Sequence, residues 1–209
     1  MPMSDARTLK DPRRVSRRSA GGAPNPRWQF LRGFLKNPVM VGSIIPSSDK
    51  LIRNMLSPVD WGACKLFVEY GPGVGTFCRP ILERMAPDAM LIAIDTNPDF
   101  IRYLDHTITD SRFVAVHGSA ADVEQIVKDH GHAAADYVLS GLPFSTLPPG
   151  VGPAIGAATH RVIRSGGAFL VYQFSPKVKD FLTPHFAQID HDMEWWNVPP
   201  AQLYWAWKD

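Results

Sequence analysis

The sequence predicts an α/β protein with a doubly wound, mostly parallel sheet of seven strands. Apolar, strand-like runs alternate with helical patterns between Lys65 and Phe174, and strands joined by right-handed helical crossovers form a parallel sheet. A glycine-rich turn follows the first of these runs, and an acidic residue, Asp95, ends the second. Two further strand-like runs, joined through Pro199 and Pro200, predict a C-terminal antiparallel hairpin.

Local patterns define each element of this sheet. Short apolar runs bounded by glycine, proline or polar residues predict strands, whereas longer runs with helical spacing predict helices. Strands are expected at residues 66–70, 90–95, 113–117, 135–140, 168–174, 188–197 and 203–208. Helices are expected at residues 49–56, 76–85, 98–104, 121–128, 152–162 and 177–182.

Length and composition limit the possible classes of protein. With 209 residues, 45% of them hydrophobic, the chain can bury one good core, which we assign to a domain at residues 61–209. No stretch approaches the roughly 20 apolar residues of a membrane span, and the start lacks the apolar core of a secretion signal. We therefore expect a cytoplasmic body. Cys64 and Cys78 match no metal spacing, so we expect buried thiols and no metal site.

The N-terminal part differs from the rest in charge. Residues 1–36 carry nine basic and two acidic side chains, a net charge of +7, which leaves −5 for the remainder. Residues 1–24, rich in Arg, Ser, Gly and Pro, predict a basic disordered arm. Such an arm is typical of proteins that bind an anionic membrane or a nucleic acid, although a solubilising tail has the same composition.

An amphipathic helix is predicted directly after the arm. Asn25 suits its N-cap and Pro26 its first position, and the helix should end before Pro38. It has an aromatic face with basic flanks, formed by Trp28, Phe30, Leu31, Arg32, Phe34, Leu35 and Lys36. Residues 25–60 therefore predict a helical segment that docks in a membrane interface, with docking on the protein core as the alternative.

The glycine-rich turn carries the most specific motif. Its glycines leave room for a ligand against the backbone and permit positive φ angles. Thr76 replaces the third glycine of a dinucleotide fingerprint, and no Lys-Ser or Lys-Thr follows as in a phosphate-binding loop. The pattern Glu69, Gly71, Gly73, Gly75 instead resembles motif I of the class I S-adenosylmethionine (SAM) methyltransferases, whose sheet is Rossmann-like.

That resemblance implies a set of cofactor contacts at the strand ends. Asp95, with Thr96 beside it, would bind the ribose hydroxyls. Ser119 and Ala120 would read the adenine, and Ser140 with Gly141 would reach the methionine end of SAM or the transferred methyl group. Each of these residues has a plain turn role as its alternative.

Residues 140–144, with the sequence Ser-Gly-Leu-Pro-Phe, resemble the N-L-P-F motif of the ribosomal RNA adenine dimethyltransferases. In that family an asparagine orients the amino group of the base and the phenylalanine stacks on the base. Gly141 takes the place of the asparagine here, so the amide that would hold a flat amine is missing. The motif therefore argues against a nucleobase as the methyl acceptor.

Taken together, three stretches resemble the bacterial phospholipid N-methyltransferases: residues 34–48, with the sequence Gly-Ser-Ile-Ile-Pro-Ser-Ser at its end, the glycine turn, and residues 140–144. Membership would imply successive methylation of phosphatidylethanolamine towards phosphatidylcholine, with S-adenosylhomocysteine as the product of each step. It would place the protein peripherally at the inner face of the cell membrane, as a monomer or weak homo-oligomer.

Tyr172 is the candidate to accept a hydrogen bond from the substrate amine and orient it, and Glu69 is the second catalytic candidate. Methylated ammonium groups bind well to aromatic faces. The candidate substrate-binding residues are therefore mostly aromatic: Ser43, Phe144, Tyr172, Trp195 and Tyr204. An aromatic hairpin that only builds the core is the alternative.

Three other functions fit parts of the sequence. If the basic arm binds RNA phosphates, the chain would suit a ribosomal RNA or other nucleic-acid adenine methyltransferase. A catalytically idle SAM-fold module could tether partners to membranes, although such a module has no need of the glycines and Asp95. An enzyme that uses NAD is disfavoured by Thr76.

Overall fold

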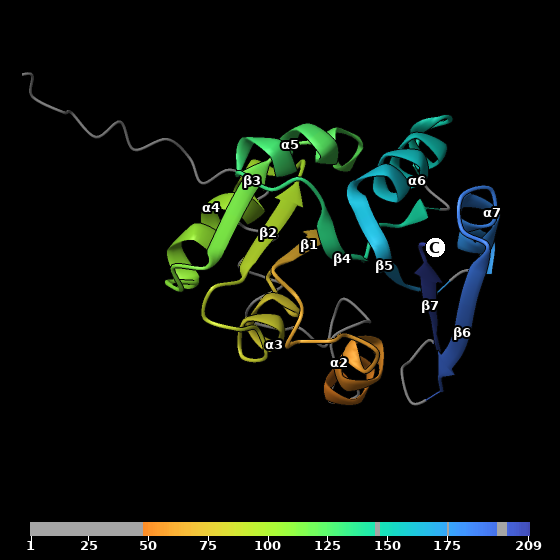
Figure 1. Cartoon of the computed structure of the whole chain (residues 1–209), viewed down its shortest axis with the longest axis horizontal. Helices are drawn as coiled ribbons and strands as arrows, with labels where there is room; N and C mark the ends of the chain where they lie inside the picture. Colours follow the sequence, from red (N-terminus) through yellow and green to blue (C-terminus); the bar gives the residue numbers. More distant parts are fainter. Residues whose placement is uncertain (1–47, 145–146, 175, 196–199) are drawn as a thin grey trace, which may run out of the picture.

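The computed structural model describes residues 48–144, 147–174, 176–195 and 200–209, and the arm, the amphipathic helix and Ser43 lie outside them. A seven-stranded sheet has the order β3-β2-β1-β4-β5-β7-β6 (Figure 1). The strands are β1 (Leu66–Tyr70), β2 (Met90–Asp95), β3 (Phe113–His117), β4 (Ala135–Ser140), β5 (Ile163–Gln173), β6 (Gln188–Glu194) and β7 (Ala201–Trp207). Strands β1 to β5 run parallel, and β7 pairs antiparallel with β5 and β6. The predicted fold class is confirmed.

Helices cover both faces of the sheet. They are α2 (Ser48–Leu56), α3 (Cys78–Leu82), α4 (Pro98–Thr107), α5 (Val123–Asp129), α6 (Val151–Val162) and α7 (Lys179–Leu182), with short 3-10 turns η2 (Ala120–Asp122) and η4 (Pro176–Val178). Side chains of α2, α3 and α4 bury a first core on one face of the sheet, and those of α5, α6 and α7 bury a second core on the other. In Figure 1, α5 and α6 accordingly lie across the sheet from α2 and α3.

Two elements differ from the predicted bounds. Helix α3 has five residues, fewer than the ten predicted, and it starts late because Pro80 has no amide hydrogen to donate to the Thr76 carbonyl oxygen. Strand β5 begins at Ile163, five residues earlier than predicted, and its pairing with β4 shifts register between Ala135 and Tyr137. Gly166, at φ +73°, provides the left-handed backbone of this irregular start.

Helix α2 packs as part of the body. Its apolar side chains Leu51, Ile52, Met55 and Leu56 are buried in the first core. The indole Nε1 of Trp205, on β7, donates a hydrogen bond of 2.9 Å to the carbonyl oxygen of Met55. None of the helices in the described part of the chain has the length and apolarity needed to cross a membrane.

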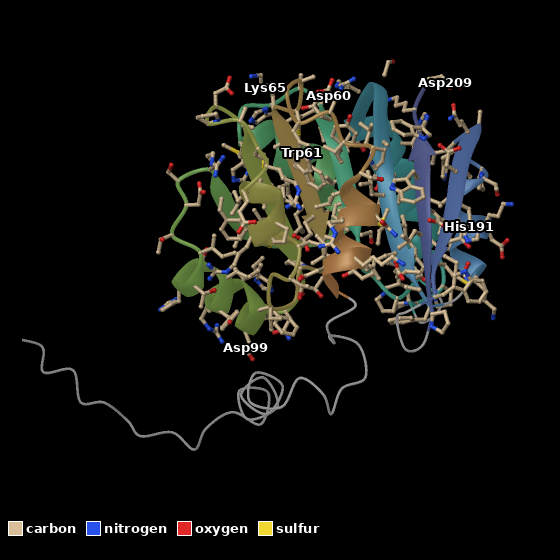
Figure 2. All side chains as sticks on the ribbon, turned by 90° about the horizontal axis from the view of Figure 1, so that it is seen from below. Asp60, Trp61, Lys65, Asp99, His191 and Asp209 are labelled. Atoms are coloured by element: carbon tan, nitrogen blue, oxygen red, sulfur yellow. The ribbon has the colours of Figure 1, made fainter. Side chains whose placement is uncertain are left out.

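The strand order reverses between β1 and β4, with β2 and β3 on one side and β5 on the other. In open α/β sheets such a reversal creates a crevice at the carboxyl ends of the strands. Figure 2 shows this carboxyl edge at the bottom, where Asp99 at the start of α4 is labelled, with Asp60, Lys65 and Asp209 at the opposite edge. The carboxyl end of β6 lies at the same edge as that of β5, because both strands pair antiparallel with β7.

Candidate active site

The glycine turn after β1 has a left-handed backbone at three positions. The φ angles are +62° at Gly71, +55° at Gly73 and +79° at Gly75, a conformation that residues with a side chain rarely adopt. The Gly71 amide donates to the carbonyl oxygen of Ile94 on β2 at 2.9 Å, and the Gly75 amide closes the turn onto Pro72 at 2.8 Å. The turn is therefore held firmly to the sheet.

Space above this turn is open at its middle glycine. A Cβ atom built on Gly73 would meet nothing within 4 Å, whereas one on Gly75 would lie 2.7 Å from Leu104. Gly75 therefore serves packing, whereas Gly73 leaves open space next to the backbone, which we call the cradle. This cradle lies at the carboxyl end of β1, where the strand order creates a crevice.

Asp95 lies beside the cradle at the tip of β2. Its Oδ1 atom accepts a hydrogen bond of 2.8 Å from the Asn97 amide, and the Gly73 amide also donates to this carboxylate. Burial raises the pKa of Asp95, although these amide donors oppose the shift. The carboxylate is half-buried and the neighbouring Thr96 is exposed, so Asp95 is the better placed of the two to bind a ligand hydroxyl.

Glu69 lies beneath the turn and is 2% exposed. The Cys78 thiol donates to its Oε2 atom, with 3.1 Å between sulfur and oxygen. Burial raises the pKa of Glu69 to about 7, while the thiol hydrogen bond lowers it and the charge of Asp95 raises it. The sequence predicted Cys78 as a buried thiol, which is confirmed, but not its pairing with Glu69. The position of Cys78 in the first turn of the helix after the glycines was the sequence signal for this pairing.

Ser119 and Ala120 follow β3 at the same edge. The Ser119 hydroxyl accepts a hydrogen bond of 3.2 Å from the Ala121 amide and caps the η2 turn, and Ala120 is buried. His117 at the end of β3 contacts the Thr96 carbonyl oxygen through Nε2 at 3.1 Å. His117 thus links the loops after β2 and β3, a role that sequence reasoning missed because it requires the pairing of the two strands.

The loop after β4 brings Gly141 against Tyr172. The buried Ser140 hydroxyl accepts from the Leu142 amide at 3.2 Å, so it shapes the loop. A Cβ atom on Gly141 would lie 2.2 Å from the Tyr172 hydroxyl oxygen and 2.6 Å from Cζ of the ring. Gly141 therefore leaves the volume that the Tyr172 phenol, from β5, occupies.

The environment of Tyr172 keeps its phenol neutral. Its ring packs against Phe77, with 4.9 Å between the ring centroids. Burial raises the pKa of Tyr172, and the nearby Glu69 carboxylate raises it further. Among the described residues, none accepts a hydrogen bond from its hydroxyl. Tyr172 can thus offer its oxygen to a ligand N–H group, but it does not act as a phenolate base.

The structure does not bring the other predicted aromatic residues to Tyr172. Tyr204 pairs across from Val171 and therefore faces the opposite side of the sheet, where its ring stacks on His191 at 4.6 Å. Phe144 is buried in the second core. Trp195, one residue past β6, is 70% exposed.

Comparison with known proteins finds a relative that matches over most of the chain. The sequence is 30% identical over 179 residues to the ornithine lipid N-methyltransferase of Singulisphaera acidiphila, and the alignment covers 85% of this chain and 93% of the relative. A shorter match of 66 residues, 35% identical, relates 32% of this chain to 21% of the ribosomal RNA small subunit methyltransferase H of Shewanella pealeana. No model of a known protein family matches the chain.

Solved structures with the same fold are methyltransferases of low sequence identity. The 1,6-didemethyltoxoflavin-N1-methyltransferase of Burkholderia thailandensis, solved with its substrate and S-adenosylhomocysteine, gives a TM-score of 0.62 at 14% identity and covers 88% of both chains. The precorrin-6y C5,15-methyltransferase of Geobacter metallireducens gives 0.61 at 16% identity, over 77% of this chain and 87% of that one. These likenesses show a class I methyltransferase fold.

The residues present fit SAM as the cofactor. The cradle at Gly73 accommodates a ligand pressed against the backbone, and the Asp95 carboxylate beside it suits the two hydroxyls of a ribose. The described loop has no lysine that would neutralise a phosphate, which agrees with a donor that lacks phosphates. Together with the relative that matches over most of its length, this shows that the chain belongs to the bacterial lipid N-methyltransferases, within the class I SAM-dependent methyltransferases.

Proposed function

We propose that the chain methylates the amine head group of phosphatidylethanolamine and its methylated derivatives, towards phosphatidylcholine, at the membrane surface. The observation that carries this proposal is the packing of Tyr172 on Gly141. It puts a single neutral oxygen where the adenine dimethyltransferases have an amide, and a single acceptor suits an aliphatic amine better than a flat base.

SAM, when bound, supplies a methyl group on a positively charged sulfur that is already a good leaving group. The amine must be neutral to attack, although a free alkylammonium group titrates near pH 10. The apolar ring of Phe77 packs against Tyr172, and such surroundings disfavour the charged ammonium and so favour the free amine. In the first two methylations the Tyr172 oxygen accepts a hydrogen bond from an N–H group of the amine and so orients its lone pair towards the methyl group. The dimethylated amine has no N–H group, so in the third step the packing around Tyr172 alone orients it.

Glu69, the second catalytic candidate, is better assigned to the cofactor side. Its carboxylate is buried beneath the glycine turn and bonded to Cys78. In that place it supports the turn from below and sets the charge next to the cofactor. The candidate cofactor set is therefore Glu69, Gly71, Gly73, Gly75, Asp95, Thr96, Ser119, Ala120 and Ser140, with direct contact expected first at Gly73 and Asp95. Gly141, predicted with this set, is assigned to the acceptor side because it lies against Tyr172.

Two exposed aromatic side chains support docking of the carboxyl edge on a membrane. Phe174, directly after β5, is 48% exposed, and Trp195 after β6 is 70% exposed. Aromatic side chains with these exposures are typical of membrane interfaces, where an apolar ring contacts lipid. The site would then open towards the lipid head groups, and the basic arm and amphipathic helix would add attraction to an anionic surface.

Ornithine lipid is the second candidate substrate, because it is the substrate in the name of the 30% identical relative. It also presents an amine on a membrane lipid, so the chemistry at Tyr172 is unchanged. RNA is less well supported, since the match to the ribosomal RNA enzyme spans only a fifth of that protein.

Incubation with radiolabelled SAM tests this proposal directly. Separate reactions contain vesicles with phosphatidylethanolamine, vesicles with ornithine lipid, or ribosomal RNA, and Asp95→Ala serves as the variant that lacks the cofactor site. We expect label in the phosphatidylethanolamine extract and none with Asp95→Ala. Label only in ornithine lipid would select the second candidate, and label only in RNA would overturn the lipid function.

Sedimentation with vesicles tests the membrane role. We expect the full chain to sediment with anionic vesicles at low salt, and a chain lacking residues 1–36 to stay in the supernatant. Zwitterionic vesicles are the control for charge. Equal binding by the shortened chain would remove the arm and the helix from the docking surface.

A further inference from the structure

A cavity of about 250 Å³ lies on the far side of the loop after β4. Its wall is largely apolar and combines the end of this loop with the starts of α6 and α7. The side chains that form it are Phe144, Leu147, Pro148, Pro149, Pro153 and Phe181. Lys177 and Asp180 are the charged lining residues, one of each sign, so the lining carries no net charge.

The inner wall of this cavity is fixed by the second core. The Phe144 ring contacts Phe181 at 5.7 Å and Phe169 at 6.4 Å between ring centroids. Gly152 permits this packing, because a Cβ atom there would lie 3.0 Å from the Phe181 ring. A wall held in this way gives the cavity a defined shape before any ligand binds.

The same loop forms a side of the reaction site. Gly141 lies against Tyr172, and Phe144, three residues later, forms the wall of the cavity. The Gln173 side-chain amide donates to the Leu142 carbonyl oxygen and holds the loop to β5. The reaction site and the cavity therefore share this loop, with Tyr172 at one side of it and Phe144 at the other.

We propose that this cavity binds an acyl chain of the lipid whose amine is methylated. The inference rests on the proposed function, since it assigns a second part of the same substrate. A long apolar chain fits a wall of phenylalanine, proline and leucine, and the balanced charges of Lys177 and Asp180 disfavour a second charged head group. Phe174, directly after β5, is 48% exposed and adds an apolar ring at the same edge of the sheet.

Photo-crosslinking tests the cavity without relying on turnover. The probe is phosphatidylethanolamine with a diazirine in one acyl chain, incubated with the full chain and S-adenosylhomocysteine. We expect adducts on peptides that contain residues 147–153 or Phe181. Adducts only on other segments, or no adducts in the presence of bound vesicles, would overturn the proposal.

A charge placed in the cavity gives a second test. Leu147 is half-buried in its wall, so Leu147→Asp should lower the ratio of kcat/KM for dioleoyl over dihexanoyl phosphatidylethanolamine by about tenfold. Thr109→Asp is the matched control, because Thr109 is exposed at a polar cavity between α3 and α4. An unchanged ratio in a Leu147→Asp variant with a native melting curve would reject the acyl-chain site.

The two proposals fail in different ways. If label from SAM enters phosphatidylethanolamine but crosslinks lie elsewhere, the cavity assignment is wrong and the function stands. If crosslinks lie in the cavity but no lipid is methylated, the chain site stands and the proposed function fails.

Discussion

Two glycine loops meet at the reversal of the sheet, and they need glycine for different reasons. In the loop after β1 the backbone itself requires it, since Gly71, Gly73 and Gly75 all have positive φ angles. In the loop after β4, Gly141 has no such angle and needs glycine only because the Tyr172 phenol occupies the place of a Cβ. The first requirement is local, and the second arises from packing between neighbouring strands.

This difference separates the two halves of the reaction. The loop after β1 presents open backbone to the cofactor, whereas the loop after β4 presents a side chain from β5 to the methyl acceptor. A substitution at each glycine should therefore affect a different measurement, cofactor binding in one case and turnover in the other.

Gly73→Ala should have the largest effect, on cofactor binding. The new methyl group would fill the cradle, so we expect the Kd for S-adenosylhomocysteine to rise on the order of 100-fold, because small misplacements at a tight site are costly. Isothermal titration calorimetry measures this. Gly131→Ala is the matched control, since Gly131 also has a positive φ angle, +82°, and open space around it but lies between α5 and β4. Equal losses in both variants would mean that backbone strain, and not the cradle, is responsible.

Gly141→Ala tests the other loop. Its Cβ would displace Tyr172 or the loop, so we expect kcat on the lipid to fall several tens of times, with the affinity for S-adenosylhomocysteine unchanged within about threefold. Gly62→Ala is the control, because its Cβ would make only an ordinary contact of 3.4 Å with Asp60. If cofactor affinity falls together with kcat, Gly141 belongs to the cofactor site and the division between the loops is wrong.

Tyr172→Phe tests how much one oxygen atom contributes to kcat. The ring stays packed against Phe77 while the hydrogen bond to the amine is lost, so we expect kcat to fall about tenfold, the usual value of one hydrogen bond. Tyr204→Phe, on the opposite face of the sheet, is the control and should leave kcat unchanged. A full loss of activity in Tyr204→Phe would restore it to the substrate site.

The fold was predictable because the sequence patterns that determine it are short. Each buried strand of the parallel part is a run of apolar residues, and Glu69, the three glycines and Asp95 have their spacing within about 30 residues. Element ends were less predictable where distant pairing decides them, as at the start of β5, where the register with β4 shifts. The predictions for the arm, the amphipathic helix and Ser43 concern residues outside those that the structure describes.

The acceptor side of the site was predicted only in part. Tyr172 was identified, but its contact with Gly141 joins residues 31 positions apart and depends on the pairing of β4 with β5. Tyr204 was predicted to lie beside Tyr172, but the sequence alone does not give the register of the hairpin. Since strand side chains alternate, a pairing of Tyr204 with Val171 places it on the other face. The hydrogen bond between Glu69 and Cys78 was not predicted, because it depends on the geometry of the glycine turn between them.

The smallest expected effect is a pH dependence of stability. It comes from Glu69, the buried acid below the loop after β1. The pKa of Glu69 is raised to about 7 in the folded chain, from an ordinary value near 4.3 in the unfolded chain. Between these values the folded state binds the proton more strongly, so stability falls as pH rises from about 4.5 to 7 and levels off above. The Glu69→Gln variant should lack this fall in stability.

Thermal melting from pH 5 to pH 8 measures the contribution of Glu69 to stability. At pH 8 we expect Glu69→Gln to be more stable than the unmodified chain by about 1 kcal/mol, because relief of the buried charge is partly offset by the buried amide, and Tm to rise by about 2–4 °C. Glu83→Gln, at an exposed acid in the turn after α3, removes the same charge without burial and should give no such pH-dependent difference. A parallel pH dependence in Glu69→Gln and the unmodified chain would show that Glu69 is already ionised at pH 5, and that the turn above it tolerates a buried negative charge.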